Sequence, residues 1–438
     1  MKPLLFFILC SCIVQYAFAQ DPSSQPTLQL QDAINIALHN SYDIQLAKND
    51  VRVNTTYNNI GVAGGLPVVT GAAQNREQVT SLNQKYSDPS RNATRNNAFS
   101  NNFSSGIDGT VLLYNGMRVK ATKKRLDELQ SQSQERLNSQ IQNTIADIMV
   151  NYFDIVRQQS YIKTIDESIV VARQKLFIIQ TQKSVGFANN ADLFQAQIDL
   201  SALEQAKQSQ QLVIDQTKTE LLRIMNLNTD SLINIADTII ADKTLTLDAV
   251  LERIPANPDI VAAQEQVRIN ELLTKETAAQ RYPSLSASGG YNFNRTKNAA
   301  GFSLLNQSYG PYVSVGIGIP IYNGSVYKRQ QRVAEINTES ADIQRKSLER
   351  DYKASVIKNF QAYTTSLKQL EIERNTFDTA QQLLNIVLQR FQLRVNTVLE
   401  VRQAEESFIN EAYRLVNLSF AAKAAEIEMK RLAGILAF

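Results

Sequence analysis

The sequence predicts an α+β fold that is mostly α-helical and is built twice within one chain. Short motifs of the first half return in the second half at constant spacings. Two long stretches, 118–184 and 325–392, contain neither proline nor glycine, which is typical of uninterrupted helices. Segments in which polar and apolar residues alternate precede each long stretch, and this period of two indicates β-strands.

The composition excludes most classes of enzyme. The chain of 438 residues has 45 Lys and Arg against 42 Asp and Glu, so it lacks the excess positive charge that nucleic-acid binding requires. It contains a single histidine, His39, and two cysteines, too few for a His-based triad or a Cys/His metal site. We interpret His39 as a surface residue, because an isolated imidazole has no evident partner. We therefore expect no catalytic residues, no metal and no cofactor.

The first nineteen residues are expected to form a secretory signal peptide. Lys2 gives a basic start, residues 4–14 form a short apolar run, and Ala-Phe-Ala at 17–19 fits a cleavage site. Cleavage would remove both cysteines, so disulfides cannot stabilise the mature chain. Lipidation at Cys12 is an alternative, but the apolar stretch before it is short for a lipoprotein signal. No later segment reaches the roughly 18 apolar residues of a transmembrane helix.

Self-similarity divides the chain into two repeats. Asp32-Ala33-Ile34 returns as Asp248-Ala249-Val250, 216 positions later. Further along, Tyr114-Asn115-Gly116 returns as Tyr322-Asn323-Gly324, at a spacing of 208. Two constant spacings indicate an internal duplication in which one loop has been shortened. The expected parts are, in order, the signal peptide at 1–19, the first repeat at 20–229, a linker at 230–244 and the second repeat at 245–438.

Each repeat is expected to begin with one helix of moderate length, at about 31–62 and 248–278. Pro67 and Pro283 end the helical pattern, because the residue before a proline avoids the α region. The first strands then follow at 67–76 and 283–293.

A loop and a second strand come next in each repeat. The loop at 77–102 is rich in Asn, Ser and charged residues, and we expect it to be solvated. Asn-Gly turns close the second strands before the long helices begin. The second strands carry one face of alternating residues each, namely Ile107, Gly109, Val111 and Leu113, and Val313, Val315, Ile317, Ile319 and Ile321.

The long helices at 118–184 and 325–392 carry apolar residues spaced by threes, fours and sevens, which predicts a coiled-coil seam. At ~1.5 Å per residue each helix is roughly 100 Å long, too long for a globular core to cover. The seam residues include Ile145, Ile148, Tyr152, Ile155 and Ile165 in the first helix, and Val333, Ile336, Ile343, Ile357, Leu370, Leu384 and Phe391 in the second.

The shorter helices of each repeat together match the long helix in length, so we expect them to stack end to end beside it. Their last members are predicted at 191–226 and 399–433. The strands then lie at one end of a rod, and the turns at 185–190 and 393–398 lie at the other.

Four strands leave two open sheet edges, which a bilayer does not tolerate. The second strands have about the nine to eleven residues that a tilted membrane strand needs, and tyrosines near the strand ends fit an interfacial girdle. Four strands cannot close a barrel of useful width, so oligomerisation would have to complete it. The alternative is that the strands form the rim of a soluble sandwich.

With this plan the chain resembles the TolC family of outer-membrane efflux and secretion channels. The resemblance rests on the duplicated helix and strand order, on Leu66-Pro67 and Tyr282-Pro283 before the first strands, and on the Tyr-Asn-Gly exits. It also rests on Ser184-Val185-Gly186 followed by Asp192 and Ala196. It implies a homotrimer in the lipid of the bacterial outer membrane, with a twelve-stranded transmembrane β-barrel and a long coiled-coil helical barrel in the periplasm.

The resemblance further implies a passive exit duct in a tripartite efflux or type I secretion system. Its partners would be a periplasmic adaptor protein and an inner-membrane transporter, and it would have no catalytic activity. The competing hypothesis is an exported periplasmic coiled-coil scaffold without a pore. That hypothesis explains the helices and the signal peptide, but not the alternation in both strand pairs.

The family also implies a pore gate. Glu400 matches an acidic position at the family's constriction, and Asp192 is its counterpart in the first repeat. Gln403 stands where the family has a second acid, so we expect a weaker acidic ring. Alternatively, Glu400 and Asp192 only satisfy backbone donors at helix starts, because Thr397-x-x-Glu400 is a capping box and Asn189-x-x-Asp192 is its analogue.

The two turns at the end of the rod are the expected contact with the adaptor. Arg394 stands where family members often have a glycine, so the second turn is expected to contact its adaptor differently. The candidate contact residues are Gly186, Phe187, Asn189 and Asn190 in the first turn, and Arg394, Val395 and Asn396 in the second.

Overall fold

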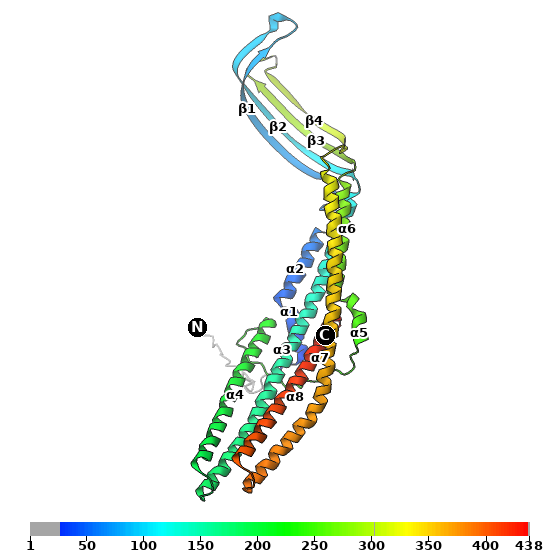
Figure 1. Cartoon of the computed structure of the whole chain (residues 1–438). Coiled ribbons are helices and arrows are strands. Elements are labelled where there is room, and N and C mark those ends of the chain that lie inside the picture. The colour runs from blue at the N-terminus through cyan, green and yellow to red at the C-terminus, as the bar shows by residue number, and fades with distance from the viewer. Residues whose placement is uncertain (1–26, 302, 437–438) are drawn as a thin grey trace, which may run out of the picture.

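The protein is a long rod of helices with a β-sheet at one end, as the computed structural model shows for residues 27–301 and 303–436 (Figure 1). The expected signal peptide and Cys12 lie outside these described residues. The helices are α1 (Leu30–Asn40), α2 (Tyr42–Tyr57), α3 (Arg118–Ser184), α4 (Asn190–Ile224), α5 (Leu247–Arg253), α6 (Pro258–Ala279), α7 (Val326–Gln392) and α8 (Val398–Leu432). The strands are β1 (Val68–Gln84), β2 (Ala93–Asn115), β3 (Ser284–Asn298) and β4 (Leu305–Gly318).

The long helices confirm the prediction from the absence of proline and glycine. α3 covers the predicted stretch, and α7 begins one residue later than predicted. α1, α2 and α4 pack along α3, while α5, α6 and α8 pack along α7, so the shorter helices do stack beside the long ones. The α3–α4 and α7–α8 turns lie at the end opposite the sheet, as expected (Figure 1).

The prediction of one continuous first helix in each repeat is wrong. In the first repeat the chain leaves the helical conformation at Ser41, with φ −54° and ψ 127°, and α2 starts immediately after it. The second repeat breaks 216 positions later at Asn257, with φ −63° and ψ 134°. Pro258 begins α6, so Asn257 must avoid the α region, and its side chain accepts a hydrogen bond from the Asp259 amide at 2.8 Å. His39 is exposed in the last turn of α1, as expected.

The seam of α3 is buried as predicted, whereas the seam of α7 is buried only toward the turn. Leu370, Leu384 and Phe391 lie in the interior of the chain. Nearer the sheet, Val333 and Ile343 are 56% and 60% exposed. Ile336 and Ile357 are exposed as well, so this part of the predicted coiled-coil seam is not buried within the chain. The described residues of the same chain do not cover this stripe.

The four strands form one antiparallel sheet in the order β1-β2-β3-β4, so the central pair β2 and β3 joins the two repeats. The expected solvated loop at 77–102 is wrong, because β1 extends to Gln84 and β2 begins at Ala93. Backbone pairing does not require apolar side chains. Polar side chains also bond across the strands here, since the side-chain amide of Asn101 donates a hydrogen bond to the side-chain oxygen of Asn75 at 2.8 Å. β4 ends at Gly318, earlier than predicted, because Pro320 has no N–H to donate to the ladder.

The register gives the sheet one apolar and one polar face, because paired residues point to the same side. The mostly apolar face includes Val69, Gly71 and Ala73 of β1, Ile107, Gly109 and Val111 of β2, Ala287, Gly289, Tyr291 and Phe293 of β3, and Val313, Val315 and Ile317 of β4. The polar face includes Thr70, Gln74, Ser104, Asp108, Ser286, Ser288, Asn292, Asn294, Ser308 and Ser314. The predicted alternation is therefore confirmed within the paired strands, whereas Leu113 lies at a register shift and Ile319 and Ile321 lie beyond β4.

Gly116 and Gly324 occupy equivalent turns between strand and long helix, and they provide a matched test of packing at the junction. Both have φ +66°, where an L-residue is strained by roughly 1 kcal/mol. A Cβ at Gly116 would also lie 2.8 Å from the Ala279 carbonyl oxygen, whereas a Cβ at Gly324 would meet nothing within 4 Å. We predict that Gly116→Ala lowers the urea midpoint clearly more than Gly324→Ala does. Equal midpoints for the two variants would show that the junction is not packed as described.

Candidate functional site

The two turns at the end of the rod have the same backbone structure. Gly186 ends α3 with φ +80°, and Arg394 ends α7 with φ +63°. The Phe187 amide donates to the Gln182 carbonyl at 2.8 Å, and the Val395 amide donates to the Arg390 carbonyl at 2.9 Å. Both are Schellman motifs, and the arginine adopts a left-handed conformation that usually favours glycine, at a cost of roughly 1 kcal/mol.

Arg394 joins the two turns. Its guanidinium carbon lies 3.8 Å from the centroid of the Phe187 ring, which belongs to the other turn. A cation–π contact at an exposed site contributes about 0.5–1 kcal/mol, which offsets much of the strain of the left-handed arginine. The sequence identified both residues as tip candidates but gave no sign of their contact, because they are far apart in the chain and differ between the repeats.

Helix starts hold the predicted gate residues. The Glu400 carboxylate accepts from the Thr397 amide at 2.6 Å, and the Thr397 hydroxyl accepts from the Glu400 amide at 3.3 Å. The capping box is thus complete, and the bond from the Thr397 backbone lowers the pKa of Glu400. In the first repeat only half of the analogous pair forms: Asn189 accepts from the Asp192 amide at 2.8 Å.

The remaining candidates are on or near the surface. The carboxylate of Asp192 and the side-chain amide of Gln403 make no hydrogen bond or ion pair with the described residues. Ala196, part of the family resemblance, is fully buried beneath the first turn. Asn396 is half-buried, and its side-chain oxygen has no hydrogen-bond partner within the described chain. The exposed tip residues are Gly186, Phe187, Asn189, Asn190, Arg394 and Val395.

A buried ion cluster above the turns escaped the sequence analysis. Lys175 of α3 is completely buried, and its ammonium lies 2.6 Å from Glu405 of α8 and 3.3 Å from Asp199 of α4. Burial raises the pKa of Glu405, while Lys175 acts in the opposite direction. Removing one partner of such a buried pair typically costs about 3–5 kcal/mol. The sequence contained one clue to this cluster, namely a lysine at a position where the apolar spacing of α3 expects a buried side chain: Lys175 stands between the buried Ala172 and Ile179.

A second buried acid lies where α7 meets α8. Glu373 of α7 is 5% exposed, and burial followed by the neighbouring carboxyl of Glu411 raises its pKa to about 7. The Arg414 guanidinium lies 3.8 Å from Glu373 and 3.2 Å from Glu411, and its positive charge partly counteracts the raised pKa of Glu373.

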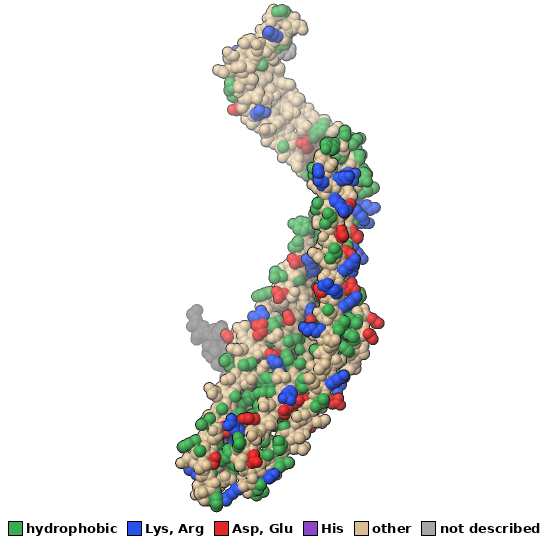
Figure 2. Space-filling model, in the orientation of Figure 1, with side chains coloured by type: hydrophobic (Ala, Val, Ile, Leu, Met, Phe, Trp, Pro, Cys, Tyr) green, Lys and Arg blue, Asp and Glu red, His purple; other side chains and the backbone are tan. Residues whose placement is uncertain are grey.

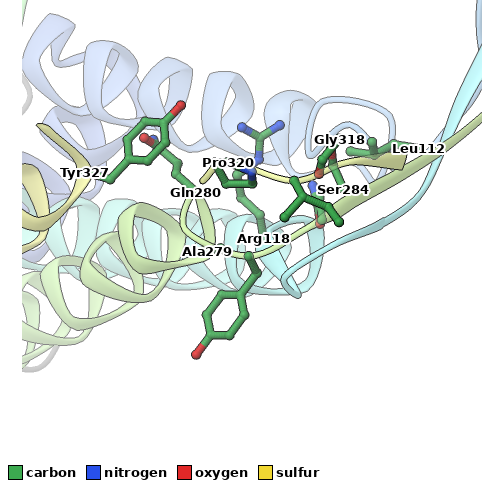
Figure 3. A pocket seen from close by; sticks show the side chains of 11 residues that line it. Leu112, Arg118, Ala279, Gln280, Ser284, Gly318, Pro320 and Tyr327 are labelled. Atoms are coloured by element: carbon green, nitrogen blue, oxygen red, sulfur yellow. The ribbon is translucent and has the colours of Figure 1, made fainter. Parts of the chain in front are cut away.

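The sheet–helix junction contains a cavity of about 680 Å³, at the opposite end from the turns (Figure 3). Its polar lining comes from Arg118, Gln280, Ser284 and Tyr327 among others, and it contains no nucleophile with an adjacent base. Within residues 27–301 and 303–436, no group of three or more His, Cys, Asp and Glu side chains is placed to hold a metal ion. None of the described helices combines the length and hydropathy needed to cross a membrane.

The raised pKa of Glu373 predicts a pH-dependent α7–α8 contact. The pKa of Glu373 in the folded state exceeds the ordinary value of 4.5, so the folded protein binds this proton more tightly than the unfolded chain does. The contribution of Glu373 to the free energy of unfolding is therefore most favourable below about pH 4.5 and is lost as the pH rises through about 7. We predict that Glu373→Gln removes this dependence and stabilises the protein at pH 8 by on the order of 2 kcal/mol. Urea midpoints between about pH 5 and 8 measure it, with the exposed Glu371→Gln as the control. Parallel pH curves for the parent and Glu373→Gln would contradict the prediction.

Comparisons with known proteins agree with this structure. The sequence model of the outer membrane efflux protein family matches residues 33–227 and 252–435. An uncharacterized protein of Haemophilus influenzae is 23% identical over 410 residues, which cover 91% of this chain and 85% of the relative. Outer membrane protein TolC of Escherichia coli is 23% identical over 183 residues, 39% of this chain and 37% of TolC.

Solved structures show the same fold at low sequence identity. VceC of Vibrio cholerae superposes with a TM-score of 0.76 at 16% identity, over 93% of this chain and 96% of VceC. The CmeC channel of Campylobacter jejuni has a TM-score of 0.75 at 15% identity, over 99% of this chain and 94% of CmeC. Because the family model matches most of the chain, the protein belongs to the outer membrane efflux protein family.

Proposed function

We propose that three copies of this chain form a passive exit duct across the outer membrane and the periplasm. The observation that carries the proposal is the sheet, in which β1 and β4 each pair on one side only. Val313, on the apolar face of β4, is 86% exposed. In a bilayer every backbone group must be paired, so the free edge of β4 needs the free edge of β1 from another copy. The family resemblance supports a ring of three copies.

The helices support the same assembly. The apolar stripe of α7 that includes Val333 and Ile343 lies exposed in a single chain. α4 likewise exposes Phe194 and Ile198, at 57% and 62%. Contiguous apolar surface of this kind marks an interaction site, and neighbouring copies in a closed ring would cover it. The scaffold without a pore offers no reason for a two-faced sheet with open edges.

The turns at the far end of the rod would face the periplasm and dock on a periplasmic adaptor, which links the duct to an inner-membrane transporter. Phe187 and Arg394 form the exposed centre of this surface, since they join the two turns. In such a tripartite efflux or type I secretion system the transporter and the adaptor select the substrate, and the duct only conducts it.

Single-channel recording after reconstitution tests the duct and its acidic ring. Three copies of Glu400 near the closed end would attract cations, particularly multivalent ones. We predict that Glu400→Gln weakens cation preference and block by trivalent cations several-fold, while its amide oxygen still accepts from the Thr397 amide. Glu252→Gln on α5 makes the same change at an exposed site far from the turns and should leave both unchanged. If Glu400→Gln and Asp192→Asn both give recordings like those of the parent, the acidic ring is excluded. If the parent protein itself shows no conductance, the duct is excluded.

Cysteine crosslinking tests the orientation, because the expected mature chain has no other thiol. We predict that Asn189→Cys and Asn396→Cys crosslink to the adaptor in cells. Asn306→Cys, on β4 at the other end of the molecule, should not crosslink to it. Labelling of position 189 or 396 by a membrane-impermeant reagent added outside intact cells would reverse the proposed orientation.

A further inference from the structure

The strand segments next to the helices are almost free of charge. Residues 68–75, 284–294 and 305–318 contain no Asp, Glu, Lys or Arg. The corresponding part of β2 contains only Asp108, which lies on the polar face and accepts a hydrogen bond from the Tyr312 hydroxyl. A bilayer would therefore meet an uncharged band on this part of the sheet.

Exposed aromatic and aliphatic side chains mark the lower border of this band. Tyr114, Tyr282 and Tyr322 are 42%, 57% and 84% exposed where the strands join the helices. Ile319 and Ile321, just beyond β4, are exposed as well. Tyrosine rings at such a border are typical of the interface between hydrocarbon and headgroups.

Cations follow immediately at the starts of both long helices. α3 begins with five Lys and Arg residues before its first acid, Asp127, and α7 has three before Glu335. Helix starts ordinarily favour acids, because the helix dipole is positive there. Figure 2 shows Lys and Arg side chains gathered on the helices directly below the sheet, with few on the sheet itself.

Four of these cations have no partner within the described chain. Arg118, Lys120 and Lys124 of α3 and Lys328 of α7 are exposed and form no ion pair with the described residues, and we call these four the cationic belt. Others nearby are paired, for example Arg125 with Glu276 at 2.6 Å. The first two turns of a helix rise about 10 Å, which is enough to span a headgroup layer of roughly 5–8 Å. The belt thus supplies uncompensated positive charge at the depth where lipid phosphates would lie.

We propose that the cationic belt binds the phosphate groups of anionic phospholipids in the periplasmic leaflet of the outer membrane. This contact would set the depth of the channel, because it lies at a fixed distance below the uncharged band of the sheet. Each Lys or Arg near an anionic bilayer surface strengthens binding about fivefold, and salt weakens this attraction. The inference rests on the proposed position of the sheet in the bilayer.

The test is a thermal-unfolding titration of the full mature protein in neutral detergent, with phosphatidylglycerol or phosphatidylcholine added. We expect phosphatidylglycerol to raise the unfolding temperature more than phosphatidylcholine, and added salt to reduce the difference. The combined variant Lys120→Gln, Lys124→Gln and Lys328→Gln should lose at least roughly tenfold in apparent affinity for phosphatidylglycerol. The control is Lys163→Gln, Lys183→Gln and Lys368→Gln, which removes the same charge at exposed, unpaired sites away from the sheet and should respond like the parent.

An unchanged phosphatidylglycerol response in the belt variant would overturn the inference. If that variant does not fold, Lys328→Gln compared with Lys368→Gln decides in the same way, with equal responses contradicting the belt. An equal rise with inorganic phosphate, lost in the belt variant, would make the belt a site for soluble anions and also contradict lipid binding. Normal conductance in phosphatidylcholine bilayers together with an unchanged lipid response would leave the duct intact and remove only the belt.

Discussion

The unpaired edges of the four-stranded sheet constrain the rest of the structure. β1 and β4 each present a row of backbone donors and acceptors, and the face that includes Val313 and Val315 is apolar. Such a sheet is unstable in water because of its apolar face, and it is unstable in a bilayer because of its edges. Pairing with further copies would satisfy the edges, and the hydrocarbon of a bilayer would then cover the apolar face. In this proposed assembly a neighbouring copy would cover the exposed stripe of α7, and the helices of each copy would form one part of a helical barrel.

The end of the rod that carries the two turns is organised by contacts that differ between the repeats. The two turns share one backbone structure, yet Gly186 in one is replaced by the strained Arg394 in the other. The contact of Arg394 with Phe187 offsets this strain and ties the two helical hairpins together. Above it, Lys175 links α3, α4 and α8 through Asp199 and Glu405. The two repeats therefore share one backbone structure, and side chains that differ between the repeats determine how the two helical hairpins contact each other.

Sequence reasoning predicted what local chemistry determines. The bounds of α3 and α7 followed from the absence of proline and glycine, and the two faces of the sheet followed from alternation. The break at Ser41 was missed because no proline marks it, although Pro258 marked its counterpart. The polar ends of β1 and β2 were taken for a loop, because Asn and Ser disfavour strands locally while pairing between strands does not depend on them. The buried Lys175 cluster and the Arg394–Phe187 contact could not be predicted, because they join segments that are distant in the sequence. The exposure of the α7 seam could not be predicted either, because the apolar spacing does not say which helix covers it.

The mass of the purified particle in detergent, corrected for bound detergent, tests the need for edge pairing most directly. The full chain has a mass of 49.0 kDa, so closure by three copies predicts a stable particle of about three mature chain masses. A monodisperse monomer that retains its strand content by circular dichroism would show that the edges need no partner, and it would contradict the proposed assembly.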